Sequence, residues 1–180
     1  FLVLATENPI DQEGTYPLPE AQLDRFLLHV KIGYPDANSE QAILRLARGE
    51  AMNAANDIEH PLSAEDIMKA RQEVLSLHMS DAVEQYLVQL IMATREPKAY
   101  GEDIANWIEY GASPRGTIAL DRCARAHAWL AGRDYVSPDD IKAVAHDVLR
   151  HRLLLSFEAE ASGMNSQQVI NELLKRVPVA

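Results

Sequence analysis

The chain begins with a run of apolar residues that has no polar alternation. Residues 1–5 are Phe, Leu, Val, Leu and Ala, a run typical of a strand buried on both faces of a parallel sheet. Residues 27–32 form a second candidate strand, after a gap long enough for a parallel crossover. Two strands cannot cover both faces of a sheet, so we expect the C-terminal part of a longer α/β protein. The alternative is a helical domain with a short terminal hairpin.

From residue 38 onward, apolar residues recur at helical spacing between helix-start and helix-stop signals. Ser63, Ser80, Ser113 and Ser137 are typical N-caps, and Gly132 is a typical helix end. The predicted helices cover residues 38–48 (from Asn38 or Ser39), 64–78, 80–95, 113–130, 137–150 and 166–176. We expect residues 100–111 to be irregular and residues 153–155 to form a short strand or a packed connector.

One domain boundary is expected near Tyr34, Pro35 and Asp36, in a turn-rich region. The predicted fold class is therefore mostly α. Residues 1–34 would be the end of a parallel α/β core that carries its last two strands, and residues 35–180 would be a helical bundle.

Composition narrows the function classes. The 180 residues are 47% hydrophobic and 24% charged, as in ordinary globular proteins. The formal charge of −10 repels phosphodiester backbones and argues against a nucleic-acid binder. The one cysteine excludes an internal disulfide, and the six histidines lack metal-site spacing. With no apolar run near the ~18 residues that span a bilayer and no signal segment, we expect a cytoplasmic location.

Asn8 is the first candidate functional residue. It stands just past the predicted strand 1–5, at the sheet edge where ligands bind in parallel α/β folds. Its amide could orient a water molecule against a phosphate, and Pro9 would restrict Asn8 to extended geometry. The alternative is that the Asn-Pro pair is merely a turn.

Arg25 is the second candidate. It follows Leu23 and Asp24 and precedes the apolar residues 26–28, a setting in which a guanidinium should have a partner. One candidate partner is a phosphate, such as one bound to a neighbouring subunit. The other is a local carboxylate, Asp24 or Glu20, and such an ion pair would contribute little to stability.

Arg115 is the third candidate, because it lies in the first turn of the helix that starts at Ser113 and Pro114. A cation is unfavourable at the positive end of a helix dipole unless an anion lies nearby. Free backbone amides, the dipole and Arg115 together would bind a phosphate. The alternatives are exposure to solvent or an ion pair with Asp103 or Glu109.

Three segments together resemble the MoxR family of AAA+ ATPases. They are residues 5–26, the helix start Gly111-Ala112-Ser113-Pro114-Arg115, and residues 132–140. The resemblance covers nearly the whole chain. It implies that residues 1–34 end the nucleotide-binding core and that the rest is the helical lid of the ATPase.

The resemblance also implies roles for the three candidates. Asn8 would be the sensor-1 residue that polarises the attacking water, Arg25 the arginine finger that reaches the ATP of the adjacent subunit, and Arg115 the sensor-2 residue on the lid. Members of the family are hexameric, chaperone-like machines that use ATP and Mg²⁺. They help to mature metal- or cofactor-containing client enzymes, often beside a partner with a von Willebrand factor A domain.

The sequence departs from the family pattern at two residues and lacks two of the family's motifs. Glu7 stands where Gln is frequent, and Gly116 follows Arg115 where Ala is usual, at a cost of up to about 1 kcal/mol in helix propensity. None of the eight glycines is followed by Lys, so the phosphate-cradling Walker A loop is absent from this chain. The Walker B carboxylate strand is also absent, and we expect the isolated chain to be inactive.

Two other functions are compatible with the sequence. One is a non-catalytic helical module that docks a client or partner protein. The other is a DNA-processing AAA+ relative, because helicases and chelatases share this type of Leu-Asp-Arg-Phe turn at residues 23–26. The acidic charge argues against the second.

Overall fold

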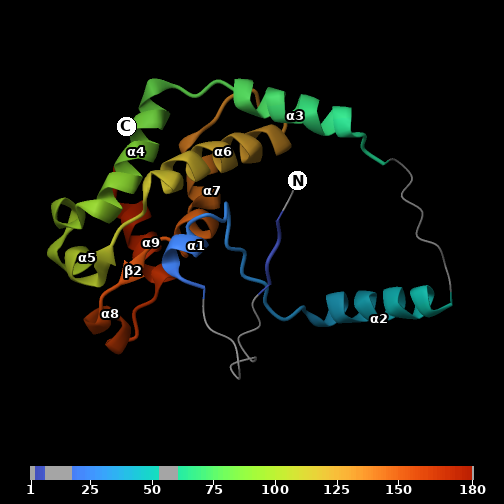
Figure 1. Ribbon diagram of the computed structural model, residues 1–180, viewed down its shortest axis with the longest axis horizontal. Helices are drawn as coiled ribbons and strands as arrows, with labels where there is room; N and C mark the ends of the chain where they lie inside the picture. Colours follow the sequence, from blue (N-terminus) through green and yellow to red (C-terminus); the bar gives the residue numbers. More distant parts are fainter. Residues whose placement is uncertain (1–2, 7–17, 53–60, 180) are drawn as a thin grey trace.

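The computed structural model describes residues 3–6, 18–52 and 61–179, and most of them form a bundle of helices (Figure 1). The elements follow in the order α1 (Glu20–Leu23), α2 (Ala37–Ala51), α3 (Ala64–Ser76), α4 (Asp81–Arg95), the 3-10 helix η1 (Pro97–Tyr100), α5 (Glu102–Trp107), β1 (Ile108–Tyr110), α6 (Pro114–Leu130), α7 (Pro138–Leu149), β2 (Leu154–Leu155), α8 (Phe157–Ala161) and α9 (Ser166–Arg176). The mostly helical fold class is confirmed. Within the described ranges, no helix is long and apolar enough to cross a membrane.

The core lies where α4, α6, α7 and α9 meet. Each of these helices turns an apolar stripe inward, as amphipathic helices do when they pack on one another. Among the largest fully buried side chains are Tyr86, Leu90, Ile91, Leu120, Ile141, Leu149, Ile170 and Leu173. The most extensive helix contact joins α6 to α7, so these two helices form the support on which the candidate site is built.

Local cap signals set most helix starts as predicted. Ser63 caps α3 and Ser137 caps α7, each in a reciprocal capping box with the Asp three residues later. Helix α2 begins at Ala37 rather than at the predicted residue 38 or 39. The reason is that Asp36 is its N-cap and accepts a hydrogen bond from the backbone N–H of Ser39 at 2.8 Å.

The prediction that residues 100–111 are irregular is wrong, because this segment contains α5 and β1. Strand β1 pairs antiparallel with β2, with Ile108 opposite Leu155 and Tyr110 opposite Leu154. Ile108 and Leu155 are buried in the core. Helical periodicity could not reveal this pairing, since its two halves lie far apart along the chain. Residues 153–155 do contain the short strand that was one of the two expectations.

The two predicted N-terminal strands do not form in the described residues. Residues 3–6 and 27–32 carry no strand, and the side chains of Leu4 and Ile32 are 82% and 93% exposed. A β-strand gains its stability from pairing with a neighbour, and no described segment offers one there. Instead, the backbone N–H of His29 donates to the Asp147 carbonyl at 2.8 Å, which ties this segment to the end of α7.

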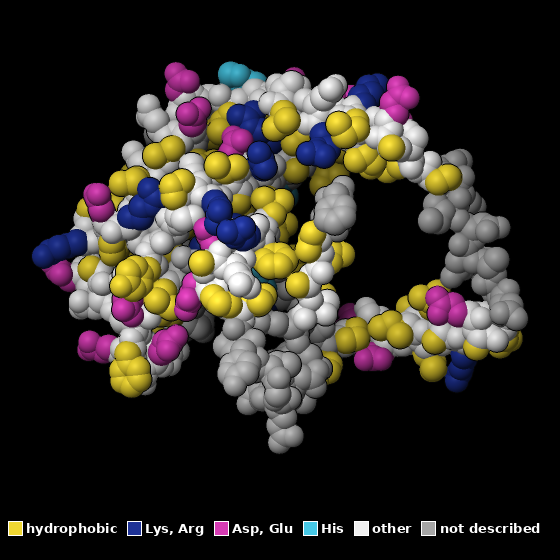
Figure 2. All heavy atoms as spheres, viewed as in Figure 1, with side chains coloured by type: hydrophobic (Ala, Val, Ile, Leu, Met, Phe, Trp, Pro, Cys, Tyr) yellow, Lys and Arg dark blue, Asp and Glu magenta, His cyan; other side chains and the backbone are white. Residues whose placement is uncertain are grey.

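Helix α2 stands apart from the bundle, whereas α3 lies along α6 (Figure 1). Hydrophobic side chains line the surface of α2 (Figure 2), among them Ile43, Leu44 and Leu46, which are each about half exposed. The amphipathic pattern of α2 is therefore not matched by a partner within the described residues.

Candidate functional site

The start of α6 is held in place by the end of α4. The Ala112 N–H donates to the Thr94 hydroxyl at 3.0 Å, and the Arg95 guanidinium donates to the Ala112 carbonyl at 2.8 Å. Ser113 then caps the helix, because its hydroxyl accepts from the Arg115 N–H at 3.1 Å. Ser113 and Arg115 therefore project from a backbone that is fixed on both sides of the cap.

Arg115 lies in the first turn of α6 and meets a carboxylate there. Its guanidinium is 3.4 Å from the Asp24 carboxylate, and the Ser113 hydroxyl donates to the same oxygen at 2.8 Å. The expected alternative partner Asp103 instead pairs with Arg176 at 2.6 Å. A cation at this helix end requires an anion nearby, and Asp24 supplies one. The Arg115 side chain is still 53% exposed, so it can also reach an anion from outside.

Asp24 and Arg25 form the turn that follows α1. The turn is closed by backbone hydrogen bonds from Arg25 to Gln22 and from Phe26 to Leu23, at 3.1 and 3.0 Å. The Arg25 side chain is exposed. It forms no ion pair with any described residue, and the local pairing with Asp24 is not observed because Asp24 binds Arg115 and Arg152.

Arg152 is a functional candidate that the sequence reasoning missed. Its side chain is 2% exposed, and its Nε lies 3.1 Å from the Asp24 carboxylate. Burial lowers the pKa of Arg152 and the Asp24 carboxylate opposes this shift, so a charge is held inside the protein by its partner. Gly116 packs closely at the start of α6, since a Cβ at that position would lie 3.1 Å from the Ala112 Cβ and 3.3 Å from the Ile91 Cδ1, whereas its 3.5 Å distance to the Arg152 Cδ would be an ordinary contact.

The two residues before Arg152 contact the same N-terminal segment. Arg150 donates to the His29 carbonyl at 2.9 Å, and the His151 Nε2 lies 3.2 Å from the Phe26 carbonyl. Burial, helped by the positive charge of Arg152, lowers the pKa of His151 to about 4. His151 is therefore neutral near pH 7, and its Nε2 carries the proton because a carbonyl can only accept. A basic tripeptide directly before the apolar residues 153–155 was the sequence signal for this contact.

Asn8 lies outside the described residues, so its predicted role stays a prediction. Two of the described histidines contact other side chains: His127 bonds Asp140 at 2.6 Å and His146 bonds Asn171 at 2.9 Å. Across the described ranges, no three His, Cys, Asp or Glu residues gather as a metal site.

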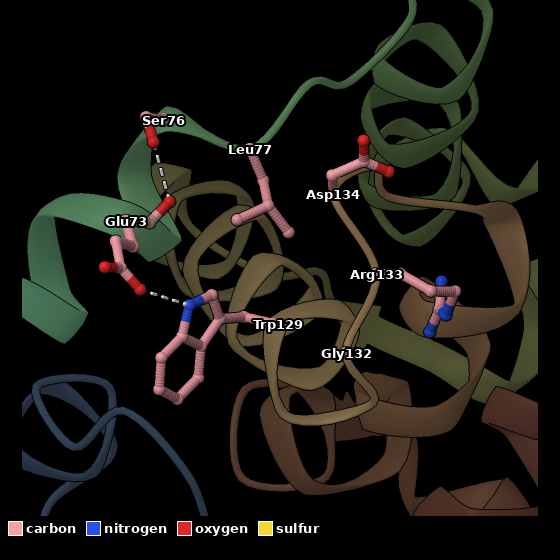
Figure 3. A pocket seen from close by; sticks show the side chains of 7 residues that line it. All are labelled: Glu73, Ser76, Leu77, Trp129, Gly132, Arg133 and Asp134. Atoms are coloured by element: carbon pink, nitrogen blue, oxygen red, sulfur yellow. Dashed lines mark hydrogen bonds between the residues drawn. The ribbon is translucent and has the colours of Figure 1, made fainter.

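A shallow groove lies on another side of the bundle, between α3 and the turn after α6 (Figure 3). Its lining residues are Glu73, Ser76, Leu77, Trp129, Gly132, Arg133 and Asp134. The Trp129 indole N–H donates to the Glu73 carboxylate at 3.0 Å, a hydrogen bond between two of the residues that line the groove. Neither Arg25 nor Arg115 contributes to it.

Two family models match parts of the chain. The model described as the AAA lid domain matches residues 102–173, which include the start of α6 and the basic tripeptide 150–152. The model described as the ATPase family associated with various cellular activities matches residues 1–28, which include the Arg25 turn. The contact between Asp24 and Arg152 therefore joins the two matched segments.

Similar proteins extend the likeness to the whole chain. Chaperone MoxR1 of Mycobacterium tuberculosis is 41% identical over 178 residues, which are 98% of this chain and 46% of that protein. The YeaC protein of Bacillus subtilis is 39% identical over 179 residues, 99% of this chain and 53% of that protein. The chain thus spans about half the length of these curated relatives.

A solved structure carries the same fold. A Cytophaga hutchinsonii protein described as an ATPase shares 45% sequence identity with this chain, and its crystal structure superposes with a TM-score of 0.93. The match covers 100% of this chain and 54% of that protein chain. The sequence likeness, the lid match and the shared fold agree. The chain belongs to the MoxR family of AAA+ ATPases and represents a C-terminal part that includes the lid.

Proposed function

We propose that the complete protein hydrolyses ATP bound between a nucleotide-binding core and this helical lid, as one subunit of a ring, expected to be a hexamer. Residues 1–34 would belong to the core and residues 35–180 to the lid. Hydrolysis would drive chaperone-like remodelling, with the maturation of metal- or cofactor-containing enzymes as the expected task. A protein with a von Willebrand factor A domain is the expected partner.

One observation carries this proposal. Arg25 is exposed on a short turn whose backbone is bonded to the lid, and it has no ion pair with a described residue. A fixed backbone with a free guanidinium suits an arginine finger, which must reach the phosphates of a neighbouring subunit and neutralise charge in the transition state.

The other two candidates take supporting roles in the proposal. Arg115, with the N-terminal amides of α6, would bind a phosphate oxygen of ATP as the sensor-2 residue, in place of its contact with Asp24. Asn8 would polarise the attacking water. Mg²⁺ would be held mainly by residues of the complete protein that are absent from this chain. The described residues contain no group of three His, Cys, Asp or Glu side chains that could hold a metal ion.

The test is Arg25→Ala in the complete protein. We expect ATP affinity to change little and turnover to fall by about three to five orders of magnitude, because the finger acts on the transition state. Arg71→Ala, which removes an exposed arginine on α3, is the matched control and should leave turnover unchanged. Wild-type turnover in the Arg25→Ala protein would refute the proposal.

A ring experiment tests the action across subunits. Excess Arg25→Ala subunits mixed with wild-type subunits should lower the turnover per wild-type subunit, because each substituted neighbour leaves one ATP without its finger. Turnover that simply follows the number of wild-type subunits would contradict action on a neighbouring subunit.

A further inference from the structure

The side chain of Arg152 is surrounded by acceptors from the turn that carries Arg25. Its Nε donates to the Asp24 carboxylate at 3.1 Å, and its Nη2 donates to the carbonyls of Asp24 and Phe26 at 3.1 and 2.6 Å. Its Nη1 donates to the Leu27 carbonyl at 3.2 Å and to the Val148 carbonyl. A guanidinium has five N–H donors, so every donor of this buried side chain has a partner.

Four of these five acceptors lie within residues 24–27, on both sides of Arg25 along the chain. The fifth, Val148, is a carbonyl of the last turn of α7, so the same guanidinium also completes the end of that helix. The arrangement ties the backbone of the turn directly to the lid. It leaves the Arg25 side chain itself outside the contact and exposed.

We infer that Arg152 is a positioning residue for Arg25. It fixes the turn at residues 24–27 to the end of α7, so that the position of the lid sets the position of the Arg25 side chain. The inference rests on the proposed role of Arg25 in ATP hydrolysis. Arg152 is 2% exposed and therefore acts through the turn rather than by touching nucleotide.

The physical reason is the geometric demand of the reaction. A catalytic group that is misplaced by about 1 Å can lose about two orders of magnitude in rate. A short turn closed by local backbone hydrogen bonds has limited packing of its own, since Arg25 is exposed and neither Asp24 nor Phe26 is fully buried. The five bonds of Arg152 supply the missing restraint, and Asp24 extends it to Ser113 and Arg115 at the start of α6.

The experiment compares ATP turnover of the complete protein with Arg152→Met, Arg25→Ala and the double variant. We expect Arg152→Met to lower kcat by about 100-fold with KM within about threefold of wild type. The double variant should be no slower than Arg25→Ala alone, because Arg152 acts through Arg25. Arg152→Lys keeps the buried charge but has three donors, and its kcat should lie between those of wild type and Arg152→Met.

Arg176→Met is the matched control. Arg176 also joins a carboxylate, Asp103, and a backbone carbonyl, that of Tyr100, but it links α9 to α5 and contacts no residue of the turn at residues 24–27. Its loss should lower thermal stability and leave kcat unchanged. An equal drop of kcat in both methionine variants would show that Arg152 has a merely structural effect and would overturn the inference.

Hydrogen exchange gives a readout that does not depend on activity. The N–H groups of Arg25 and Phe26 should exchange faster in Arg152→Met and Arg152→Lys than in wild type, and Arg176→Met should leave them unchanged. Unchanged exchange at these two amides in both Arg152 variants would overturn the inference.

The outcomes separate this inference from the proposed function. If Arg25→Ala abolishes turnover while both Arg152 variants keep wild-type kcat, the inference alone fails. If Arg25→Ala keeps wild-type turnover, the proposed function fails and the inference fails with it. Effects of Arg152→Met and Arg25→Ala that multiply in the double variant would also overturn it, since they would be independent.

Discussion

Asp140 is the polar centre of the contact between α6 and α7, and its replacement by Asn gives the sharpest stability prediction. The residue is 1% exposed and accepts hydrogen bonds from both Nη atoms of Arg133, from His127 and from the N–H and hydroxyl of Ser137. Asp140→Asn keeps the shape of the side chain and removes its charge. The perturbation is therefore electrostatic rather than a cavity.

The magnitude follows from the partners. Hydrogen bonds to a charged group contribute about 1.5–3 kcal/mol each and neutral ones about 0.5–1.5 kcal/mol, while breaking a buried ion pair costs about 3–5 kcal/mol. Arg133 and His127 are 29% and 46% exposed, so water can replace part of what they lose. We therefore expect a loss of about 2–3 kcal/mol, or roughly 4–12 °C in Tm for a chain of this size.

Denaturant unfolding followed by tryptophan fluorescence is the assay, because Trp107 and Trp129 both lie in the bundle. Asp139→Asn is the matched control. Asp139 shares the first turn of α7 and its helix dipole, but its side chain is 87% exposed and its one ion pair among the described residues is with Lys142. Its substitution should change stability by less than about 1 kcal/mol. Equal losses in the two variants would refute the reasoning.

The stability that Asp140 contributes should decrease as the pH falls. Burial by itself would raise the pKa of Asp140, but the hydrogen bonds from Arg133, His127 and Ser137 outweigh it and hold the pKa well below its ordinary value. The unfolded chain then binds a proton before the folded one does, so this stabilisation is complete above about pH 5 and declines as the pH falls through about 4. The difference between wild type and Asp140→Asn should shrink over that range.

Two further predictions concern packing and thiol chemistry. Gly111→Ala should lower the free energy of unfolding by about 1–3 kcal/mol in denaturant unfolding, because the new Cβ would lie 2.3 Å from the backbone oxygen of Thr94. Gly33→Ala is the control: nothing lies within 4 Å of its new Cβ, so stability should change by less than about 0.5 kcal/mol. Similar losses in the two variants would contradict the close approach at Gly111. Burial raises the pKa of Cys123 to about 11. The folded protein should therefore resist alkylation by iodoacetamide at pH 8 and react fully after denaturation. Rapid alkylation of the folded protein would disprove the burial of this thiol.

The parts of the fold that were predictable from sequence are those that depend on neighbouring residues. The cap at Ser63 and the capping box of Ser137 with Asp140 are local signals, and α3 and α7 begin where these signals stand. The stop at Gly132 is equally local, because its φ of 72° suits a glycine. Helix starts and ends could therefore be predicted from a few adjacent side chains.

The misses share a different cause, which is contact between distant segments. The β1–β2 pair and the position of residues 27–32 depend on partners elsewhere in the chain. The carboxylates considered as alternative partners of Arg115 were Asp103 and Glu109, but the carboxylate that it meets, Asp24, lies 91 residues away. Spacing along the sequence carries no information about such pairs. Separate candidate residues could therefore be named from the sequence, but the cluster that Asp24 forms with Arg115 and Arg152 could not.

Helix α9 has a consequence for how the bundle is made. Its residues Val169, Ile170 and Leu173 are fully buried, and it packs against α4, α5 and α7. It is also the last of the described helices to leave the ribosome. During synthesis, one apolar face of α4 and of α7 therefore stays exposed until the 11 residues of α9 have been made. A nascent chain that stalls or is truncated before α9 would leave this apolar face exposed and be prone to aggregate.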